Sequence, residues 1–197
     1  MYKKYGKPIF DIIITIFAIP LFLISLIIFS PLIYLEDKGP VFYISKRLVK
    51  NGKLFNFYKF RSMKVNAPDI RNKDGSTFNS EKDPRLTVVG KLMRETSIDE
   101  LPQIINVINK EMSFIGPRPD LPEQYVYYKD IEKRKLIVLP GVTGYNQALY
   151  RNSIPWNKRK KNDLFYVNNI NFFLDLYILI KTLHVLVFKK EIYIRDN

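Results

Sequence analysis

The stretch from Glu95 to Gln103, with the sequence ETSIDELPQ, sets the organisation of the chain. It places two carboxylates, Asp99 and Glu100, directly before an apolar series with helical spacing. Ser97 and Glu100 have the spacing of a capping box, and Pro102 suits a first helical turn. We therefore expect both acids at or just before a helix N-terminus, where free N–H groups and the helix dipole favour ionised carboxylates.

This acid pair has two possible interpretations. An ionised aspartate beside an ionised glutamate can bind a divalent cation, and one of the two can act as a nucleophile. First helical turns are also rich in acidic residues simply because of the dipole, and on this stretch alone that interpretation is favoured. The rest of the chain is needed to decide between them.

Composition limits the chemistry that is available. The chain has 197 residues, 47% of them hydrophobic, and a formal net charge of +13. The length fits one domain, or one domain with an anchor, and the charge indicates an acidic partner such as nucleic acid, anionic lipid or a phosphorylated substrate. The absence of cysteine excludes disulfides and thiol catalysis, and the single histidine, His184, lies in an apolar run.

A long apolar run from Ile12 to Leu35 contains no charged residue. As a helix it would be ~36 Å long, enough to cross a bilayer core of ~30 Å. Pro20 and Pro31 interrupt the run, and basic residues flank both of its ends, which the positive-inside rule places in the cytoplasm. The residues alone leave two paths equally open: a spanning helix, and a re-entrant helix bent at Ser30 and Pro31.

A β-hairpin is predicted next. Residues 41–44 and 54–58 are rich in β-forming residues and flank Asn51-Gly52, the dipeptide typical of a type I′ turn. The second strand leads into Lys59-Phe60-Arg61-Ser62-Met63. Its two cations could bind phosphate, or could form a solvated strand edge.

The middle of the chain carries two further cations near the acid pair. Residues 64–85 predict a long polar loop, and residues 87–95 predict a short helix with Arg94 beside the acids. Gly116-Pro117-Arg118-Pro119 cannot be helical and holds one guanidinium on a rigid backbone. Such an Arg suits bidentate phosphate binding, or the string is a rigid connector with an exposed Arg.

The C-terminal third offers weaker signals. Residues 122–135 predict a helix, residues 140–144 a tight turn, and residues 145–156 an irregular segment. The basic run at 158–161 suits a solvated face or a lipid-headgroup contact. Residues 172–188 are apolar with three polar exceptions, which suits a helix in the membrane interface or in the core.

Together these strings resemble one family, the bacterial sugar transferases of the monotopic polyprenyl-phosphate phosphoglycosyl transferase type. The resemblance extends from Lys7 to about Phe188 and is close to the minimal form of the family. The strings that carry it are Phe10-Asp11, Ser30-Pro31, Lys59–Met63, Arg94–Gln103, Gly116–Pro119, Pro140–Gly144, Arg151-Asn152 and Asp175-Leu176.

The resemblance implies an α+β, predominantly helical fold with a small β-hairpin. Residues 1–38 would form a re-entrant membrane helix bent at Ser30-Pro31, and residues 39–197 a catalytic domain with amphipathic interfacial helices. The enzyme would lie in one leaflet, on the cytoplasmic face of the bacterial inner membrane.

The resemblance also implies a reaction. A sugar 1-phosphate would pass from a UDP-sugar to polyprenyl (undecaprenyl) phosphate with release of UMP, as the first membrane step of polysaccharide or glycoconjugate assembly. Asp99 matches the family's nucleophile, which carries the phosphosugar covalently, and Glu100 would hold Mg²⁺, with Asp99 as a candidate second ligand. Donors of minimal members often carry an N-acetylated amino sugar.

Phosphoryl transfer to an anionic acceptor requires charge neutralisation more than acid–base groups. Arg118 is expected to contact the nucleotide diphosphate, and Arg94 to bind phosphate or to orient the acids. Gln147 keeps its place in the family string although its neighbours differ, which leaves the sugar open. The candidate substrate-binding residues are Lys59, Arg61, Arg94, Pro117, Arg118, Pro119, Gln147 and Arg151.

Two alternatives stay open at the level of sequence. One is a membrane-anchored basic adaptor that binds anionic lipid or nucleic acid without catalysis. This adaptor would need neither the acid pair nor the Gly-Pro-Arg-Pro string. The sugar transferase, in contrast, would have no nucleic-acid partner. The other is a related enzyme that transfers a plain hexose phosphate.

Overall fold

The computed structural model describes residues 1–71, 78, 80, 83–151 and 154–188, so Asn152 lies outside the described residues. Its helices are α1 (Lys7–Asp37), α2 (Val88–Thr96), α3 (Gln103–Ile108), α4 (Tyr145–Tyr150), α5 (Trp156–Asn169) and α6 (Phe172–Phe188). Its strands are β1 (Phe42–Leu48), β2 (Leu54–Phe60), β3 (Ser113–Ile115) and β4 (Gly141–Thr143). A π-helical turn, η1 (Tyr2–Gly6), and four 3₁₀ turns complete the elements: η2 (Lys50–Gly52), η3 (Ile98–Glu100), η4 (Pro122–Tyr127) and η5 (Glu132–Ile137). The predominantly helical α+β fold predicted from the sequence is confirmed.

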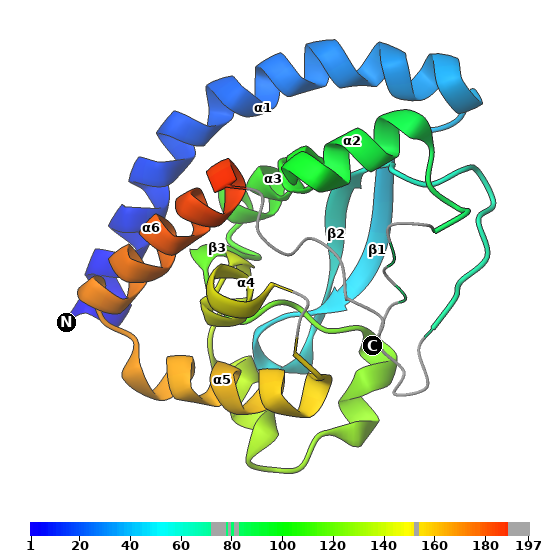
Figure 1. The fold of residues 1–197 in the computed structure, drawn as a ribbon. Helices are drawn as coiled ribbons and strands as arrows, with labels where there is room; N and C mark the ends of the chain where they lie inside the picture. The colour runs from blue at the N-terminus through cyan, green and yellow to red at the C-terminus, as the bar shows by residue number, and fades with distance from the viewer. Residues whose placement is uncertain (72–77, 79, 81–82, 152–153, 189–197) are drawn as a thin grey trace.

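The apolar N-terminal run forms one long helix, α1, which arches along the edge of the molecule (Figure 1). It stays helical through Pro20, Ser30 and Pro31, so its curvature is spread along the helix rather than concentrated in a break. Within the described residues, one helix, at Tyr2–Asp37, is long and apolar enough to cross a membrane by length and composition. The re-entrant path stays a prediction.

Only one stripe of α1 packs against the rest of the molecule. Phe10, Phe22 and Ile33 lie in this inner stripe and join the apolar cores, whereas Phe17 and Ile27 on other faces are 74% and 75% exposed. A continuous exposed apolar face of this kind marks a membrane or protein interaction site. The predicted membrane contact is consistent with this face.

Buried polar contacts fix the N-terminal end of α1 to α6 and α5. The fully buried carboxylate of Asp175 accepts hydrogen bonds from the hydroxyls of Tyr2 (2.6 Å) and Tyr166 (2.8 Å) and from the ammonium group of Lys7 (2.9 Å). Because a buried charge is tolerated only when paired and hydrogen-bonded, this cluster ties three segments together.

The C-terminal end of α1 is fixed to the hairpin and α2. Asp37 pairs with Arg61, with 3.1 Å between the guanidinium and the carboxylate. Glu36 accepts hydrogen bonds from the backbone N–H groups of Val88 and Val89 (2.6 and 3.0 Å), the first residues of α2. A carboxylate at this position accepts hydrogen bonds from the free N–H groups of the first helical turn and interacts favourably with the helix dipole.

Strands β1 and β2 form the predicted hairpin, with Phe42 opposite Phe60 and Leu48 opposite Leu54. Asn51 and Gly52 take positive φ angles of 63° and 73°, as a type I′ turn requires. Both strands run further than predicted, because the pairing continues through polar residues that carry a weak β signal.

A second pair of strands was not predicted. The strands β3 and β4 are parallel, with Ser113 paired to Gly141 and Ile115 paired to Thr143. Residues 140–144 were predicted to form a tight turn, and no element was predicted for residues 113–115. Three-residue strands are too short to produce a periodic pattern, so only the folded chain reveals them.

Other C-terminal predictions are corrected in part. Residues 122–135 contain the 3₁₀ turns η4 and part of η5 instead of one helix, and residues 145–150 form α4 although an irregular segment was predicted. The helix predicted at 172–188 is confirmed as α6, which lies beside the first half of α1 (Figure 1).

The main apolar core lies between the hairpin, α3, β3 and α6. Its buried members include Phe55 and Phe57 of β2, Ile104 of α3, Ile115 of β3 and Ile178 of α6. These elements come from distant parts of the chain, and their packing fixes the turn that carries the two acids.

Asp83 and Arg85 form a buried ion pair at the end of the polar loop, with 2.6 Å between the guanidinium and the carboxylate. Arg85 also donates to the carbonyl of Pro68 (3.0 Å), which fastens the loop. The hydrogen bond from Arg85 lowers the pKa of Asp83. The pair therefore stabilises the fold above the ordinary aspartate pKa of ~3.9, and this contribution is lost as the pH falls through the lowered pKa.

We expect Asp83→Asn to lower the free energy of unfolding by about 2 kcal/mol at pH 7, since it removes a charged hydrogen-bond acceptor from a buried guanidinium. The difference from the wild type should shrink as the pH falls below the ordinary aspartate pKa of ~3.9, because the unfolded chain then takes up a proton that folded Asp83 binds only at lower pH. Chemical denaturation at pH 7 and pH 3 measures both values. Equal losses at the two pH values would show that the carboxylate charge contributes nothing.

Candidate active site

Asp99 and Glu100 lie in η3, between α2 and α3. Ser97 ends α2 with a φ angle of 58°, and its N–H donates to the carbonyl of Arg94 (3.3 Å), so the predicted capping box is wrong. Pro102 is the last residue before α3, where a missing N–H costs little. Both acids therefore lie just before a helix N-terminus, as predicted, but in a turn that two helices hold in place.

The side chain of Asn106 fastens α3 to β2. It accepts a hydrogen bond from one backbone N–H of β2 (3.2 Å) and donates to a carbonyl two residues away (2.6 Å). This contact brings η3 to the end of β2, where Lys59 lies. The ammonium group of Lys59 is 2.6 Å from a carboxylate oxygen of Glu100 and 3.7 Å from one of Asp99.

A second cation reaches Glu100 from the Gly-Pro-Arg-Pro string. Arg118 donates to both carboxylate oxygens of Glu100, at 2.8 and 3.3 Å. Its backbone is held by the buried Lys135, which donates to the Arg118 carbonyl (3.2 Å) and pairs with Asp120 (2.6 Å) and Asp163 (2.9 Å). The predicted rigid support of Arg118 thus includes a buried ionic cluster as well as two prolines.

The two acids have different electrostatic environments. Burial raises the pKa of Asp99, while the positive charge of Lys59 opposes this shift and the negative charge of Glu100 adds to it. Burial also disfavours ionised Glu100, but Arg118 and Lys59 outweigh it and hold the pKa of Glu100 well below its usual range. Glu100 therefore anchors the two cations, and Asp99 is a buried carboxylate with a perturbed pKa, as functional acids often are.

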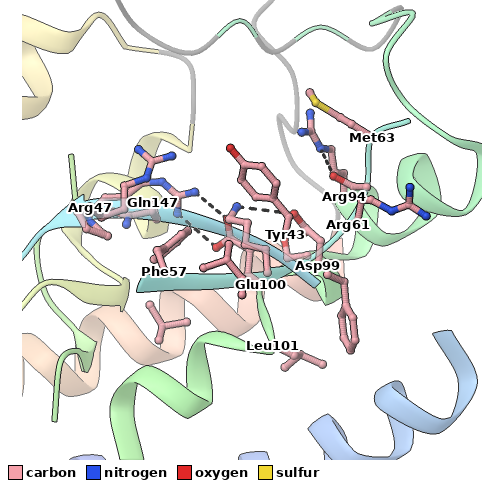
Figure 2. A pocket seen from close by; sticks show the side chains of 18 of the residues that line it. Tyr43, Arg47, Phe57, Arg61, Met63, Arg94, Asp99, Glu100, Leu101 and Gln147 are labelled. Carbon is pink, nitrogen blue, oxygen red and sulfur yellow. Dashed lines mark hydrogen bonds and ion pairs between the residues drawn. The ribbon is translucent and has the colours of Figure 1, made fainter. Parts of the chain in front are cut away.

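Arg94 and Arg61 lie on the opposite side of the acids from Gln147, and their side chains point in different directions (Figure 2). Arg94 donates to the hydroxyl of Ser62 (3.0 Å), and its charge opposes the rise in the pKa of Asp99 that burial causes. The guanidinium of Arg61 is buried against α1, where it pairs with Asp37 and donates to a backbone carbonyl (3.2 Å). The role of Arg61 as a substrate contact stays a prediction.

A cavity of about 1010 Å³ opens in front of the two acids (Figure 2). Among the described residues, ten basic and five acidic side chains line it, which suits an anionic ligand. Pro117 lies outside this lining, and Ser30 and Pro31 lie on α1. The predicted residues that the cavity brings together are Lys59, Arg61, Arg94, Asp99, Glu100, Arg118, Pro119, Gln147 and Arg151.

Sequence reasoning missed Tyr43 and Arg47, which line the same cavity from β1. Tyr43 lies directly opposite Lys59 in the hairpin, and Arg47 lies four residues further along the same strand. Residues two and four apart share a face of a strand. A two-residue turn at Asn51-Gly52 would place Tyr43 opposite Phe60, whereas the longer loop between Leu48 and Leu54 places it opposite Lys59. The turn signal therefore did not give this face, and the predicted first strand ended before Arg47.

The site provides few ligands for a metal ion. Within the described part of the chain, no group of three or more His, Cys, Asp or Glu side chains could hold a metal. Mg²⁺ often binds through one or two carboxylates and completes its shell with substrate phosphates and water. Asp99 and Glu100 fit that limited role beside a diphosphate, but they do not fit a metal cage made by protein alone.

Residues 2–189 match the family model described as bacterial sugar transferase. The chain is 41% identical over 161 residues to the galactosyl transferase CpsE of Streptococcus agalactiae serotype III, covering 77% of this chain and 36% of the relative. It is 37% identical over 202 residues to the undecaprenyl-phosphate galactose phosphotransferase of Salmonella typhimurium, covering 94% and 41%.

A third relative transfers a different sugar. The chain is 34% identical over 186 residues to the UDP-N-acetylgalactosamine-undecaprenyl-phosphate N-acetylgalactosaminephosphotransferase of Aeromonas hydrophila, covering 90% of this chain and 42% of the relative. The chain thus spans about two fifths of the length of these three relatives.

Proposed function

The chain belongs to the bacterial sugar transferase family, and we propose that it transfers a sugar 1-phosphate from a UDP-sugar to polyprenyl phosphate and releases UMP. The observation that carries this proposal is the buried Asp99 beside Glu100 at the edge of a strongly basic cavity. Undecaprenyl phosphate is the proposed acceptor, since it appears in the printed names of two relatives.

The first step is a displacement at phosphorus. A carboxylate oxygen of Asp99 attacks the β-phosphorus of the UDP-sugar, and the bond from that phosphorus to the bridging oxygen breaks. The bridging oxygen leaves with its electron pair on UMP, and the phosphosugar is left bound to Asp99. A carboxylate nucleophile explains how a chain without cysteine and with one histidine carries out covalent catalysis.

The second step restores the enzyme. An oxygen of polyprenyl phosphate attacks the same phosphorus, the bond to Asp99 breaks, and the product is a polyprenyl diphosphate sugar. Lys59 and Arg118 neutralise the phosphate charges in both steps, since both cations lie next to the acid pair at which the phosphorus reacts. Mg²⁺, held by Glu100 and Asp99 beside the diphosphate, would supply further positive charge when bound.

The cavity also suits a lipid acceptor. Its lining includes Ala18 of α1 and Val185 and Leu186 of α6, so apolar surface continues from the charged site toward the helices with exposed apolar faces. An isoprenoid phosphate has this same division between a charged head and an apolar chain. We place the enzyme in one leaflet at the cytoplasmic face of the inner membrane, with α1 and α6 against lipid.

The test is UMP release by the purified chain with Mg²⁺, undecaprenyl phosphate and a panel of UDP-sugars. The panel includes UDP-galactose and UDP-N-acetylgalactosamine, because the relatives' names contain both a plain hexose and an N-acetylated amino sugar. We expect release with a subset of the panel, and a loss of about 100-fold or more on chelation of the metal. Binding to anionic vesicles without release from any donor would favour the adaptor.

A further inference from the structure

Arg47 is a cavity-lining cation without an acidic partner among the described residues. Four other basic residues of the lining, Lys59, Arg61, Arg85 and Arg118, each form an ion pair with a carboxylate. The side chain of Arg47 is half-buried, and its Nε atom is buried without a hydrogen bond to any described group. Because withdrawing a cation from water is unfavourable without a counterion, this partly buried guanidinium is suited to an anionic ligand.

The position of Arg47 links it to the proposed reaction centre. Its guanidinium carbon lies 5.5 Å from the centre of the Phe57 ring, and the ammonium nitrogen of Lys59 lies 5.6 Å from the same ring centre. Burial lowers the pKa of Arg47 to about 10, and the nearby positive charge of Arg118 adds to this shift. Arg47 therefore stays charged at neutral pH. It lies near Arg118, one of the two cations that hold Glu100.

The arrangement of the cavity separates the nucleophile from Arg47. In Figure 2, Asp99 and Arg94 lie on one side of Glu100, whereas Arg47 and Gln147 lie on the other. In a displacement at phosphorus, the attacking oxygen, the phosphorus and the leaving oxygen are roughly in line. A leaving phosphate opposite Asp99 would therefore lie on the side of the cavity that carries Arg47.

We propose that Arg47 binds the α-phosphate of the UDP-sugar, which becomes the phosphate of the departing UMP. This inference rests on the proposed function. As the bond between the β-phosphorus and the bridging oxygen breaks, its electron pair stays on that oxygen and increases the negative charge of the α-phosphate. A guanidinium suits this group because it can donate two parallel hydrogen bonds to phosphate oxygens.

The experiment compares the binding of UMP and uridine to the full chain by calorimetric titration. We expect Arg47→Gln to weaken UMP binding by about 10- to 100-fold, the range for losing charged hydrogen bonds. Uridine, which lacks the phosphate, should bind both proteins equally. Lys46→Gln is the matched control, since it removes the same charge from an exposed neighbour on β1 and should leave UMP binding unchanged.

A second variant, Arg47→Lys, keeps the charge and loses the two-pronged donor geometry. It should weaken UMP binding by a factor between those of the wild type and Arg47→Gln, and it should leave uridine binding unchanged. If Arg47→Gln does not fold, Arg47→Lys provides the test. Unchanged UMP binding in a folded variant would overturn the proposal. So would an equal loss of UMP and uridine binding, or an increase only in the KM for polyprenyl phosphate.

The outcome for the wild type separates this inference from the proposed function. If the wild type binds UMP and Arg47→Gln binds it equally well, only the assignment of Arg47 is wrong. If the wild type binds no UMP and releases none from any UDP-sugar, the proposed function is wrong, and the assignment of Arg47 is wrong with it.

Discussion

Replacement of Asp99 by Asn is expected to lower UMP release by about 10⁴-fold or more, the scale seen when a covalent nucleophile is removed. The amide has nearly the shape of the carboxylate but cannot attack phosphorus in its place. Asp99 is 5% exposed and lies beside Glu100 and Lys59, so the variant keeps the packing of η3 while it loses the reacting oxygen. Initial rates of UMP release, with the preferred donor and undecaprenyl phosphate, give the measurement.

Asp130→Asn is the matched control for this prediction. It makes the same chemical change at a side chain that is 98% exposed on the surface, so the rate of UMP release should not change. Thermal unfolding of both variants shows whether the loss in Asp99→Asn comes from misfolding. Release by a folded Asp99→Asn variant at the wild-type rate would exclude Asp99 as the nucleophile.

The same variant separates the enzyme from the adaptor. Binding to anionic vesicles depends on surface charge and should fall with salt. It should be nearly the same in the wild type and in Asp99→Asn, because one buried carboxylate contributes little to the surface field. Asp99→Asn is therefore expected to lose transfer and to keep membrane binding.

Lys135→Met should lower the free energy of unfolding by about 3–5 kcal/mol, because it leaves the buried carboxylate of Asp163 and the partly buried one of Asp120 without their counterion. The ammonium group is 2.6 Å from Asp120 and 2.9 Å from Asp163, and the side chain of Lys135 is only 4% exposed. Burial opposes the charge, but the two carboxylates outweigh it and raise the pKa of Lys135 well above its usual value. Urea unfolding of the solubilised chain measures the loss.

Lys133→Met is the control for the buried cluster. Lys133 lies two residues before Lys135 and pairs with the exposed Asp130. An exposed pair of this kind contributes only about 0–1 kcal/mol. A loss below about 1 kcal/mol for Lys135→Met would contradict the account of a charged cluster that supports Arg118. In Lys135→Met the carbonyl of Arg118 also loses its hydrogen bond, so binding of the UDP-sugar should weaken as well.

Elements with local signals were predictable from the sequence. The Asn51-Gly52 turn sets the hairpin by requiring positive φ at two adjacent residues. The helix α2 begins after Thr87, whose side chain accepts a hydrogen bond of 2.9 Å from the N–H of Gly90, and α6 forms from a mostly apolar run. In each case, residues within one or two turns of each other decide the structure.

Elements that depend on distant partners were not predictable. The pairing of Ser113 with Gly141 joins segments 28 residues apart, and neither segment has a strand pattern of its own. The cluster around Lys135 likewise depends on Asp163, which is 28 residues away. Single-chain patterns report local preference and burial, and such long-range pairings follow only from packing.

The candidate site shows the same division. The adjacency of Asp99 and Glu100 is visible in the sequence, but their different environments are not. Glu100 is held by Lys59 and Arg118, 41 and 18 residues away, and only the folded chain reveals that both cations reach the same carboxylate. Arg47 was not predicted as a site residue, because its place in the cavity follows from the full register of the hairpin.

The most direct test of the account is the mass of the protein after incubation with its UDP-sugar and Mg²⁺ but without acceptor. We expect an added mass of one sugar phosphate, mapped to the peptide that contains Asp99, with UMP released in equal amount. Addition of polyprenyl phosphate should then remove the added mass. An adduct on another residue would contradict the account, as would rapid transfer with no adduct and no UMP release before acceptor is present.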